Sequence, residues 1–238
     1  MKVCLLCSYA LVAGAWGVRP VVKMTLRGGA SLKNRADATN VITGATVVGG
    51  LAQVKWPGLT RLGAKHGPSI MRGQWWRLWT PLALHGSLPH IACNLLSLRS
   101  VGPALESWYG PGRTTAVYLV AGAAGNVASC VANVGGISVG ASGAVAGLVG
   151  ALGVHYARHA DVLGGQSRVV LDSISRVILI NAVIGITAGG IDNWAHLGGL
   201  LGGAAAGYLF GCRFVPVRDR WGRVRGYKDK PIIRFALP

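Results

Sequence analysis

Six apolar segments run along the chain, and most of the charged residues lie between them or in the two tails. Only 13% of the residues are charged, about half the fraction in a typical soluble domain. The chain also holds 37 glycines, and small residues let membrane helices approach each other closely. The pattern predicts an all-α polytopic membrane protein with six transmembrane helices, at about residues 39–54, 88–105, 114–134, 142–155, 169–188 and 194–211.

Several of these segments are shorter than the roughly 20 residues that a lipid-exposed span requires. Short, glycine-rich spans are typical of helices that are enclosed by others or that begin below the membrane surface. The net charge of +17 is carried by tails and loops, without the aromatic and basic pattern of a nucleic-acid surface. The predicted surroundings are therefore a lipid bilayer and no nucleic acid.

The distribution of Lys and Arg predicts that both termini lie on the inner side of the membrane. The inner side then receives the N-terminal leader and the tail after Gly211, and that tail holds eight Lys and Arg. The two short outer loops hold none. The outer loop 55–87 is the exception, with five basic residues. It also contains four Trp, which favour the membrane interface, so we expect it to lie among the headgroups.

Charge and hydropathy divide the chain into three regions, a basic leader at 1–36, a membrane domain at 37–212 and a basic tail at 213–238. The first acidic residue of the chain is Asp37, and a basic leader without acids is typical of an organellar transit peptide. Its apolar start also resembles a signal peptide, and an inward-facing tail is a further interpretation. The five cysteines form no metal-like repeat.

Three groups of polar residues stand at the starts of alternate segments. His85, His90 and Asn94 open the second, Ser142 opens the fourth, and His196 lies at the start of the sixth. These three segments run in the same direction through the membrane, so their starts lie on one side at similar depth. Residues that are distant in the sequence, Ser142 and His196, are thus expected to approach each other.

Ser142 and His196 together have the chemistry of an activated nucleophile and its general base. Glycines surround the serine, and a helix start offers free N–H groups to an oxyanion. The sixth segment repeats glycine every fourth residue, a face that suits packing against the fourth segment. Each residue alone has a simpler interpretation, because a serine often caps a helix and a lone histidine often holds two helices together.

His90 and Asn94 are four residues apart and share one helical face. Both can donate hydrogen bonds, so they can stabilise an oxyanion or join neighbouring helices.

The chain resembles the rhomboid intramembrane serine proteases in three motifs on alternate helices, HGSLPHIACNLLSL, GASG and AHLGG. The stretch WWRLWTPLALH is similar to the Trp-Arg motif in that family's first loop, here Trp76-Arg77. The resemblance covers about residues 39–211. It implies a six-helix rhomboid fold that hydrolyses peptide bonds in or beside transmembrane segments of membrane proteins, with no metal or cofactor.

The resemblance also assigns roles by motif. Ser142 is the implied nucleophile and His196 the implied base of a Ser–His dyad. His90, Asn94 and the backbone N–H of Ser142 form the implied oxyanion hole. Supporting roles fall to Arg77, His85, Gly140, Gly143 and Gly199. The wording of GPGR and IDNWAHLGG is similar to plant and plastid-type rhomboids, which favours an organellar membrane. The chloroplast envelope is preferred, with mitochondrial and secretory membranes as alternatives.

Three positions need comment. Many rhomboids carry an aromatic residue one turn after the serine, where this chain has Ala146. Asp192 precedes His196 by four residues and can either orient the imidazole as a triad or favour the helix dipole. Asn193 is a candidate N-cap.

The alternative functions are a rhomboid-like protein that binds helices without cutting them, and a channel or transporter with a polar interior. The oligomeric state is left open.

Overall fold

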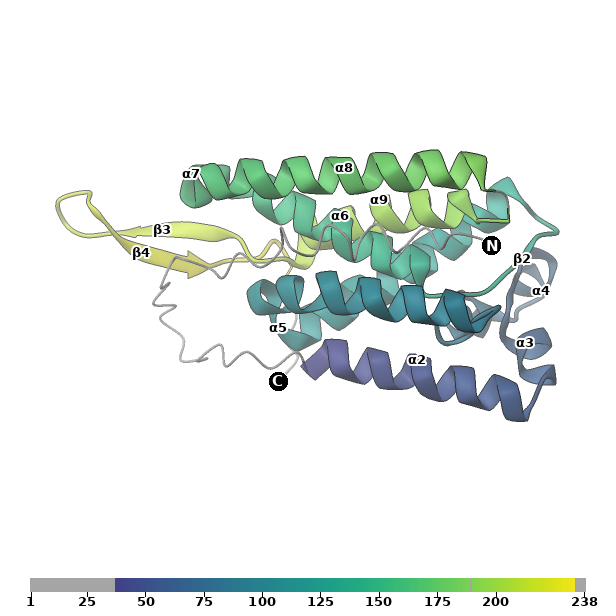
Figure 1. The fold of residues 1–238 in the computed structure, drawn as a ribbon. Coiled ribbons are helices and arrows are strands. Elements are labelled where there is room, and N and C mark those ends of the chain that lie inside the picture. The colour runs from purple at the N-terminus through teal and green to yellow at the C-terminus, as the bar shows by residue number, and fades with distance from the viewer. Residues whose placement is uncertain (1–36, 189, 234–238) are drawn as a thin grey trace.

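The computed structural model describes residues 37–188 and 190–233, so the predicted leader at 1–36 lies outside the described residues. The fold is mostly helical, with helices lying side by side and a β-hairpin that extends past one end of them (Figure 1). We call this the hairpin end and the opposite end, where β2 and α3 lie, the cavity end. The main elements are α2 (Asp37–Lys55), α5 (Leu88–Ala132), α6 (Ser142–Arg158), α8 (Gly165–Thr187), α9 (Asn193–Phe210), β3 (Phe214–Arg218) and β4 (Val224–Asp229).

Every predicted apolar segment coincides with helix in the structure. The second and third segments both belong to α5, which is interrupted at Gly110. There the backbone takes φ 76° and ψ 169°, a region in which only glycine is unstrained, and Pro111 follows. The interruption divides α5 into two arms, as the sequence predicts for two separate segments.

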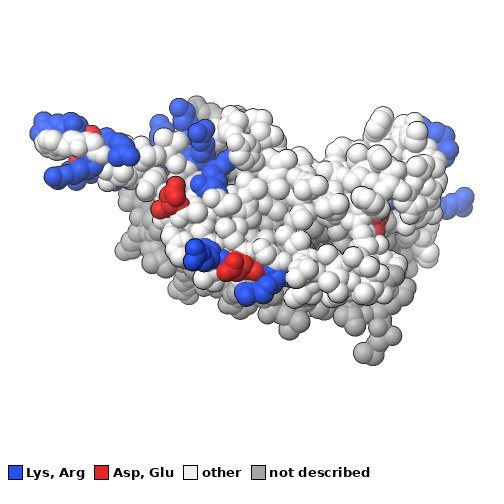
Figure 2. All heavy atoms as spheres, turned by 90° about the horizontal axis from the view of Figure 1, so that it is seen from above, with Lys and Arg blue, Asp and Glu red and all other residues white. Residues whose placement is uncertain are grey.

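Two helices, α5 and α8, are long and apolar enough to cross a membrane by length and composition. The count of six spans therefore stays a prediction. In Figure 2 the basic side chains gather at the hairpin end, and few charges interrupt the remaining surface of that face. This arrangement agrees with a body embedded in lipid and a basic end in water.

Helices α6 and α9 form the centre of the bundle with both arms of α5. The contact between α6 and α9 is backbone to backbone, because a Cβ at Gly199 would overlap the carbonyl of Gly143. A Cβ at Gly203 would likewise overlap the backbone of Gly147. The glycine stripe of the sixth segment thus packs on the fourth, as predicted.

The 55–87 connection is folded rather than extended. It contains α3 (Gly58–Gly63), β1 (Lys65–His66), α4 (Gly67–Met71), and the 3₁₀ helices η1 (Trp75–Leu78) and η2 (Thr80–Ala83). Strand β1 pairs antiparallel with β2 (Ile137–Ser138), which lies just before α6. Its four tryptophans, Trp56, Trp75, Trp76 and Trp79, are all exposed, as expected for a loop at the membrane interface.

The expectation of an all-α protein is wrong in two places, since β1 pairs with β2 and β3 pairs with β4. The second pair begins shortly after α9 and is joined to the bundle. The N–H of Phe214 donates to Nε2 of His159, and Arg113 pairs with Asp229 at 2.6 Å. An isolated two-stranded hairpin is only marginally stable, so these contacts explain why a charged tail folds here. The short helix α7 (Ala160–Leu163) completes this end.

Candidate active site

Ser142 is the first residue of α6 and follows a sharp turn. Gly140 has φ 128°, which favours glycine, and its N–H donates to the carbonyl of Pro81 at 2.9 Å. Inside the helix, the N–H of Val145 donates to Ala141, so the N–H groups before it lack an intrahelical acceptor. Ser142 therefore presents its hydroxyl beside free donors at the positive end of a helix.

His196 lies in the first turn of α9 and faces this serine. Its Nε2 is 2.7 Å from Oγ of Ser142, across 54 residues of sequence. The two side chains meet because α6 and α9 touch at Gly143 and Gly199, directly beside the pair. The structure therefore brings together the two residues that the alternating segments place on one side.

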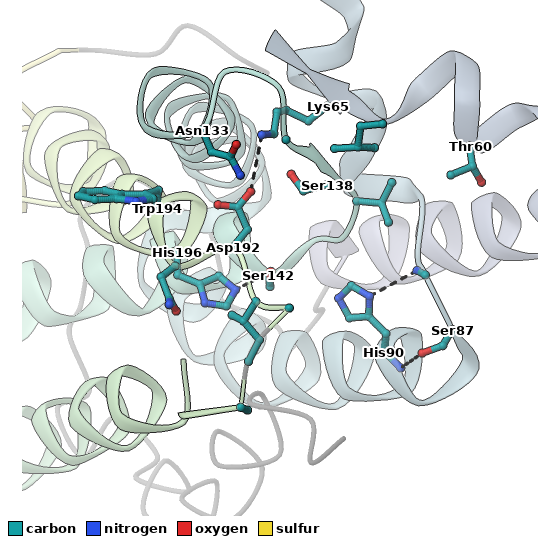
Figure 3. Close-up of a pocket in the computed structure, with 18 of the residues that line it drawn as sticks. Thr60, Lys65, Ser87, His90, Asn133, Ser138, Ser142, Asp192, Trp194 and His196 are labelled. Carbon is teal, nitrogen blue, oxygen red and sulfur yellow. Dashed lines mark hydrogen bonds and ion pairs between the residues drawn. The ribbon is translucent and has the colours of Figure 1, made fainter. Parts of the chain in front are cut away.

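His90 approaches the serine from the other side, so that Ser142 lies between the two histidines (Figure 3). The Nδ1 of His90 accepts the N–H of Gly86 at 3.4 Å, which leaves the proton of the neutral ring on Nε2. That Nε2 lies against Gly140, where an added Cβ would come within 2.8 Å of it. A hydrogen-bond donor thus borders the turn that carries Ser142.

Asn94 is 1% exposed and lies one turn further along α5. Its side-chain nitrogen donates to the carbonyl of His90 at 2.9 Å, and its Oδ1 has no hydrogen-bond partner among the described residues. The amide has two N–H groups, so one donor remains after the bond to His90.

Arg77 and His85 are buried in the wall formed by the 55–87 connection. The guanidinium of Arg77 donates to the side chain of Gln74 and to the carbonyls of Ala64 and Arg61. These bonds join η1 to the end of α3. The ring of His85 packs edge-on against His90, with 5.1 Å between centroids.

Burial, together with the neighbouring His90, lowers the pKa of His85 to about 4. The ring is therefore neutral at physiological pH. A neutral His85 adds no charge beside His90, in keeping with a packing role.

Helix α9 is capped by Asp192 rather than by the predicted Asn193. The carboxylate Oδ1 of Asp192 accepts the N–H of Ala195 at 3.0 Å. Asn193 instead donates from its side chain to the carbonyl of Gly185 in α8. The interpretation of Asp192 as a triad member finds no support, because its other oxygen accepts from Ser129 and faces Lys65.

Lys65 is the site residue that sequence reasoning missed. Its side chain is 1% exposed and its Nζ lies 3.9 Å from Oδ2 of Asp192. One lysine in a basic chain carries no local signal, and only the pairing of β1 with β2 places it at the site. Ala146 is buried in the core, and the chain has no aromatic side chain at that position.

A cavity of about 870 Å³ opens above the Ser142–His196 pair. Its lining mixes apolar and polar groups and comes from the 55–87 connection, the start of α5, β2 and the start of α9. The polar lining residues labelled in Figure 3 are Thr60, Lys65, Ser87, His90, Asn133, Ser138, Ser142, Asp192 and His196. An extended peptide entering this cavity would find hydrogen-bonding groups for its backbone. Over the described part of the chain, no group of three His, Cys, Asp or Glu is arranged to hold a metal ion.

Comparison with known proteins identifies the family. The rhomboid domain model matches residues 72–213, which include Ser142, His196, His90, Asn94, Arg77, His85 and Asp192 but not Lys65. This chain belongs to the rhomboid family, whose members are embedded in membranes.

Three relatives show how far the similarity extends. Rhomboid protease GluP of Bacillus subtilis is 41% identical over 153 residues, covering 64% of this chain and 29% of that protein. RHOMBOID-like protein 1 of Arabidopsis thaliana is 38% identical over 135 residues, or 57% and 34% of the two chains. Rhomboid-like protease 1 of Toxoplasma gondii is 34% identical over 160 residues, or 64% and 53%. The matched region thus spans from under a third to about half of these relatives.

Proposed function

We propose that this protein is an intramembrane serine protease that hydrolyses peptide bonds in or beside transmembrane segments of membrane proteins. The observation that carries the proposal is the 2.7 Å contact between Oγ of Ser142 and Nε2 of His196 under an open cavity. Relatives from Bacillus subtilis and Toxoplasma gondii are named as proteases. The six-helix membrane domain at 37–212 is part of the same proposal.

In the proposed reaction, Oγ of Ser142 attacks the carbonyl carbon of the scissile peptide bond while Nε2 of His196 takes the hydroxyl proton. The tetrahedral intermediate then collapses, the C–N bond breaks, and His196 gives its proton to the leaving amine. An acyl-enzyme ester on Ser142 remains. Water, deprotonated by His196, attacks that ester and releases the new carboxyl end with Ser142 restored.

The developing oxyanion needs donors that are already in place. The backbone N–H of Ser142 lies at the start of α6, and Nε2 of His90 borders the preceding turn. The remaining N–H of Asn94 is the third proposed donor. Removing one such donor costs about 10²–10³-fold in turnover.

The test is cleavage of a model transmembrane substrate by purified protein in liposomes. Wild type is expected to cleave, Ser142→Ala should show no turnover above background, and His196→Ala should be slower by about 10²–10⁴-fold. If folded wild type binds the substrate without cutting it, the protein is instead a rhomboid-like protein that binds membrane helices, and the protease proposal is wrong. If His196→Ala cleaves at the wild-type rate, the dyad is wrong.

We also propose an organellar membrane, with the chloroplast envelope favoured over mitochondrial and secretory membranes. The leader at 1–36 is basic and contains no acidic residue, which is typical of a transit peptide. Two Arabidopsis thaliana relatives are named as mitochondrial and chloroplastic. Imaging of a tagged full-length protein tests this location, and a plasma-membrane signal would contradict it.

A further inference from the structure

Asp192 fixes the first turn of α9 at two points. Its carboxylate Oδ1 accepts the N–H of Ala195 at 3.0 Å, and its backbone carbonyl accepts the N–H of His196 at 3.1 Å. The residue that carries the proposed base is thus held through its own backbone and that of its neighbour. Asp192 acts next to His196 in the chain, although it does not serve as a triad carboxylate.

The second carboxylate oxygen of Asp192 connects this turn to two other parts of the fold. Oδ2 accepts the hydroxyl of Ser129, in the second arm of α5, at 2.5 Å. It also faces Nζ of Lys65, in β1, at 3.9 Å. Figure 3 shows the Asp192 side chain turned toward Lys65 rather than toward His196. A buried ammonium is costly without a partner, and Asp192 supplies the opposite charge.

Lys65 extends the same network toward the serine. It lies opposite Ser138 in the β1–β2 pair, and Ser138 is four residues before Ser142. Directly after β1, a Cβ at Gly67 would overlap the carbonyl of Val134, so the chain is packed tightly against the β2 loop. Lys65 therefore links the segment before Ser142, through β2, to the segment before His196, through Asp192.

The first turn of α9 lies at the end of the glycine seam, where an added Cβ at Gly143 or at Gly125 would overlap the carbonyl of Ala195. Asn193 and Trp194 are exposed, and the first fully buried residue of the helix is Gly199. This packing holds the backbone at Ala195, whereas Asn193 and Trp194 lie on the exposed side of the turn. The polar contacts that join this turn to other elements are those of Asp192, the bond from Asn193 to Gly185, and the contact of His196 with Ser142.

We propose that Lys65, Asp192 and Ser129 form a positioning network that holds His196 in register with Ser142. This inference rests on the proposed function, because the register has value only if the dyad is catalytic. The three residues do not take part in proton transfer. They act through the backbone of α9, so their loss is expected to lower kcat more than it changes KM.

The test compares graded changes in purified protein in liposomes. Asp192→Ala removes the cap and the charge, whereas Asp192→Asn keeps a capping oxygen and removes only the charge. Lys65→Met removes the buried cation, and Lys65→Arg retains it. Asp161→Asn is the matched control, since Asp161 is an exposed acid in the first turn of α7 at the hairpin end.

We expect Asp192→Ala to lower kcat by about 100-fold, and Asp192→Asn and Lys65→Met by about 10-fold, with KM within about twofold of wild type. The double variant Lys65→Met/Asp192→Asn should be no worse than the poorer single variant, because neither charge is left unpaired. Lys65→Arg should lose less kcat than Lys65→Met, and Asp161→Asn should keep the wild-type kcat. An unchanged kcat in Asp192→Ala, or a change confined to KM, would overturn the positioning role.

A readout without substrate separates this inference from the proposed function. Hydrogen exchange of the amides of residues 193–198 is expected to be faster in Asp192→Ala than in wild type, also in a Ser142→Ala background. If wild type cleaves nothing but exchange still speeds up, proteolysis is refuted and the anchor stands. If wild type cleaves and exchange is unchanged in Asp192→Ala, the anchor itself is refuted.

Discussion

Histidines occur at both ends of the helix bundle, but the surroundings of their side chains differ between the two ends. At the cavity end, His196 contacts the hydroxyl of Ser142 beside a cavity of about 870 Å³. At the hairpin end, His155 is 1% exposed and its ring nitrogens have no hydrogen-bond partner among the described residues. Its ring packs against Trp108 at 4.7 Å between centroids and against His159 at 4.6 Å.

His159 shows a third use of the same side chain. Its Nε2 accepts the N–H of Phe214, so its proton lies on Nδ1, which donates to the carbonyl of His155 at 2.8 Å. Both ring nitrogens of His159 thus form hydrogen bonds that hold the fold together. The comparison teaches that a partner hydroxyl and an open cavity, rather than histidine itself, distinguish the candidate catalytic end. The first prediction tests this difference directly.

The largest expected effect separates His196 from His155. His196→Ala removes the proposed base and should lower turnover of a transmembrane substrate by about 10²–10⁴-fold. His155→Leu replaces a packed ring by an apolar side chain far from Ser142, and should keep turnover within a few-fold. The measurement is the initial cleavage rate at saturating substrate. Equal losses of turnover in the two variants would contradict the assignment of the active site to the cavity end.

The pH dependence of stability tests the burial of His85 at the cavity end. Its pKa is lowered from 6.5 to about 4, so the folded state favours the neutral ring. As the pH falls below 6.5, the unfolded state takes up a proton at His85 before the folded state does. The free energy of unfolding therefore falls between pH 6.5 and about 4, by at most about 3 kcal/mol, and this effect is absent above pH 6.5. The measurement is the free energy of unfolding in detergent between pH 4 and 8. His85→Leu should flatten this part of the curve, and an unchanged slope would show that His85 is not the responsible group.

A pair of glycines tests the seam that joins α6 and α9, the two helices that carry the proposed dyad. A Cβ at Gly203 would overlap the backbone of Gly147, so Gly203→Ala should lower the free energy of unfolding by about 1–3 kcal/mol. Gly153 lies on the same bundle, but its added Cβ would meet only the side chain of Ile174 at 3.8 Å. Gly153→Ala should therefore be neutral or slightly stabilising. Equal destabilisation of both variants would mean that the close approach is not specific to the seam.

The smallest expected effect concerns the hairpin. Arg113 and Asp229 form an ion pair at 2.6 Å, with side chains that are 22% and 23% exposed. Because the pair is partly solvated, Asp229→Asn should cost at most about 1 kcal/mol and leave cleavage unchanged. Limited trypsin digestion at the many Arg and Lys residues of the hairpin should become faster. A large loss of activity would instead link the hairpin end to the site.

Much of the helical framework follows from the sequence, because apolar segments and glycine spacing are local signals. The α6–α9 seam is one example, since a glycine at every fourth position presents a flat face wherever the helix packs. The contact between Ser142 and His196 follows from the alternating direction of the segments. Asn94 is less readily predicted, because its amide donates to the carbonyl of His90 and only the packed structure shows this.

The features that the sequence does not predict depend on contacts between segments that are distant in the chain. Lys65 reaches the site only because two-residue strands pair across more than seventy positions, and strands that short leave no periodic pattern. The cap of α9 is misassigned by one residue, since Asp192 and Asn193 are both good capping residues and the contact of Asn193 with α8 decides between them. The hairpin is missed because its charged sequence resembles a solvated tail.

The most direct test of the central claim is reaction of the folded protein with a fluorophosphonate, followed by mass spectrometry of the peptides. The account predicts one adduct on Ser142 in wild type, none in Ser142→Ala, and much slower labelling in His196→Ala. Labelling of wild type at a different serine, or an unlabelled Ser142 in a protein that cleaves its substrate, would contradict the dyad.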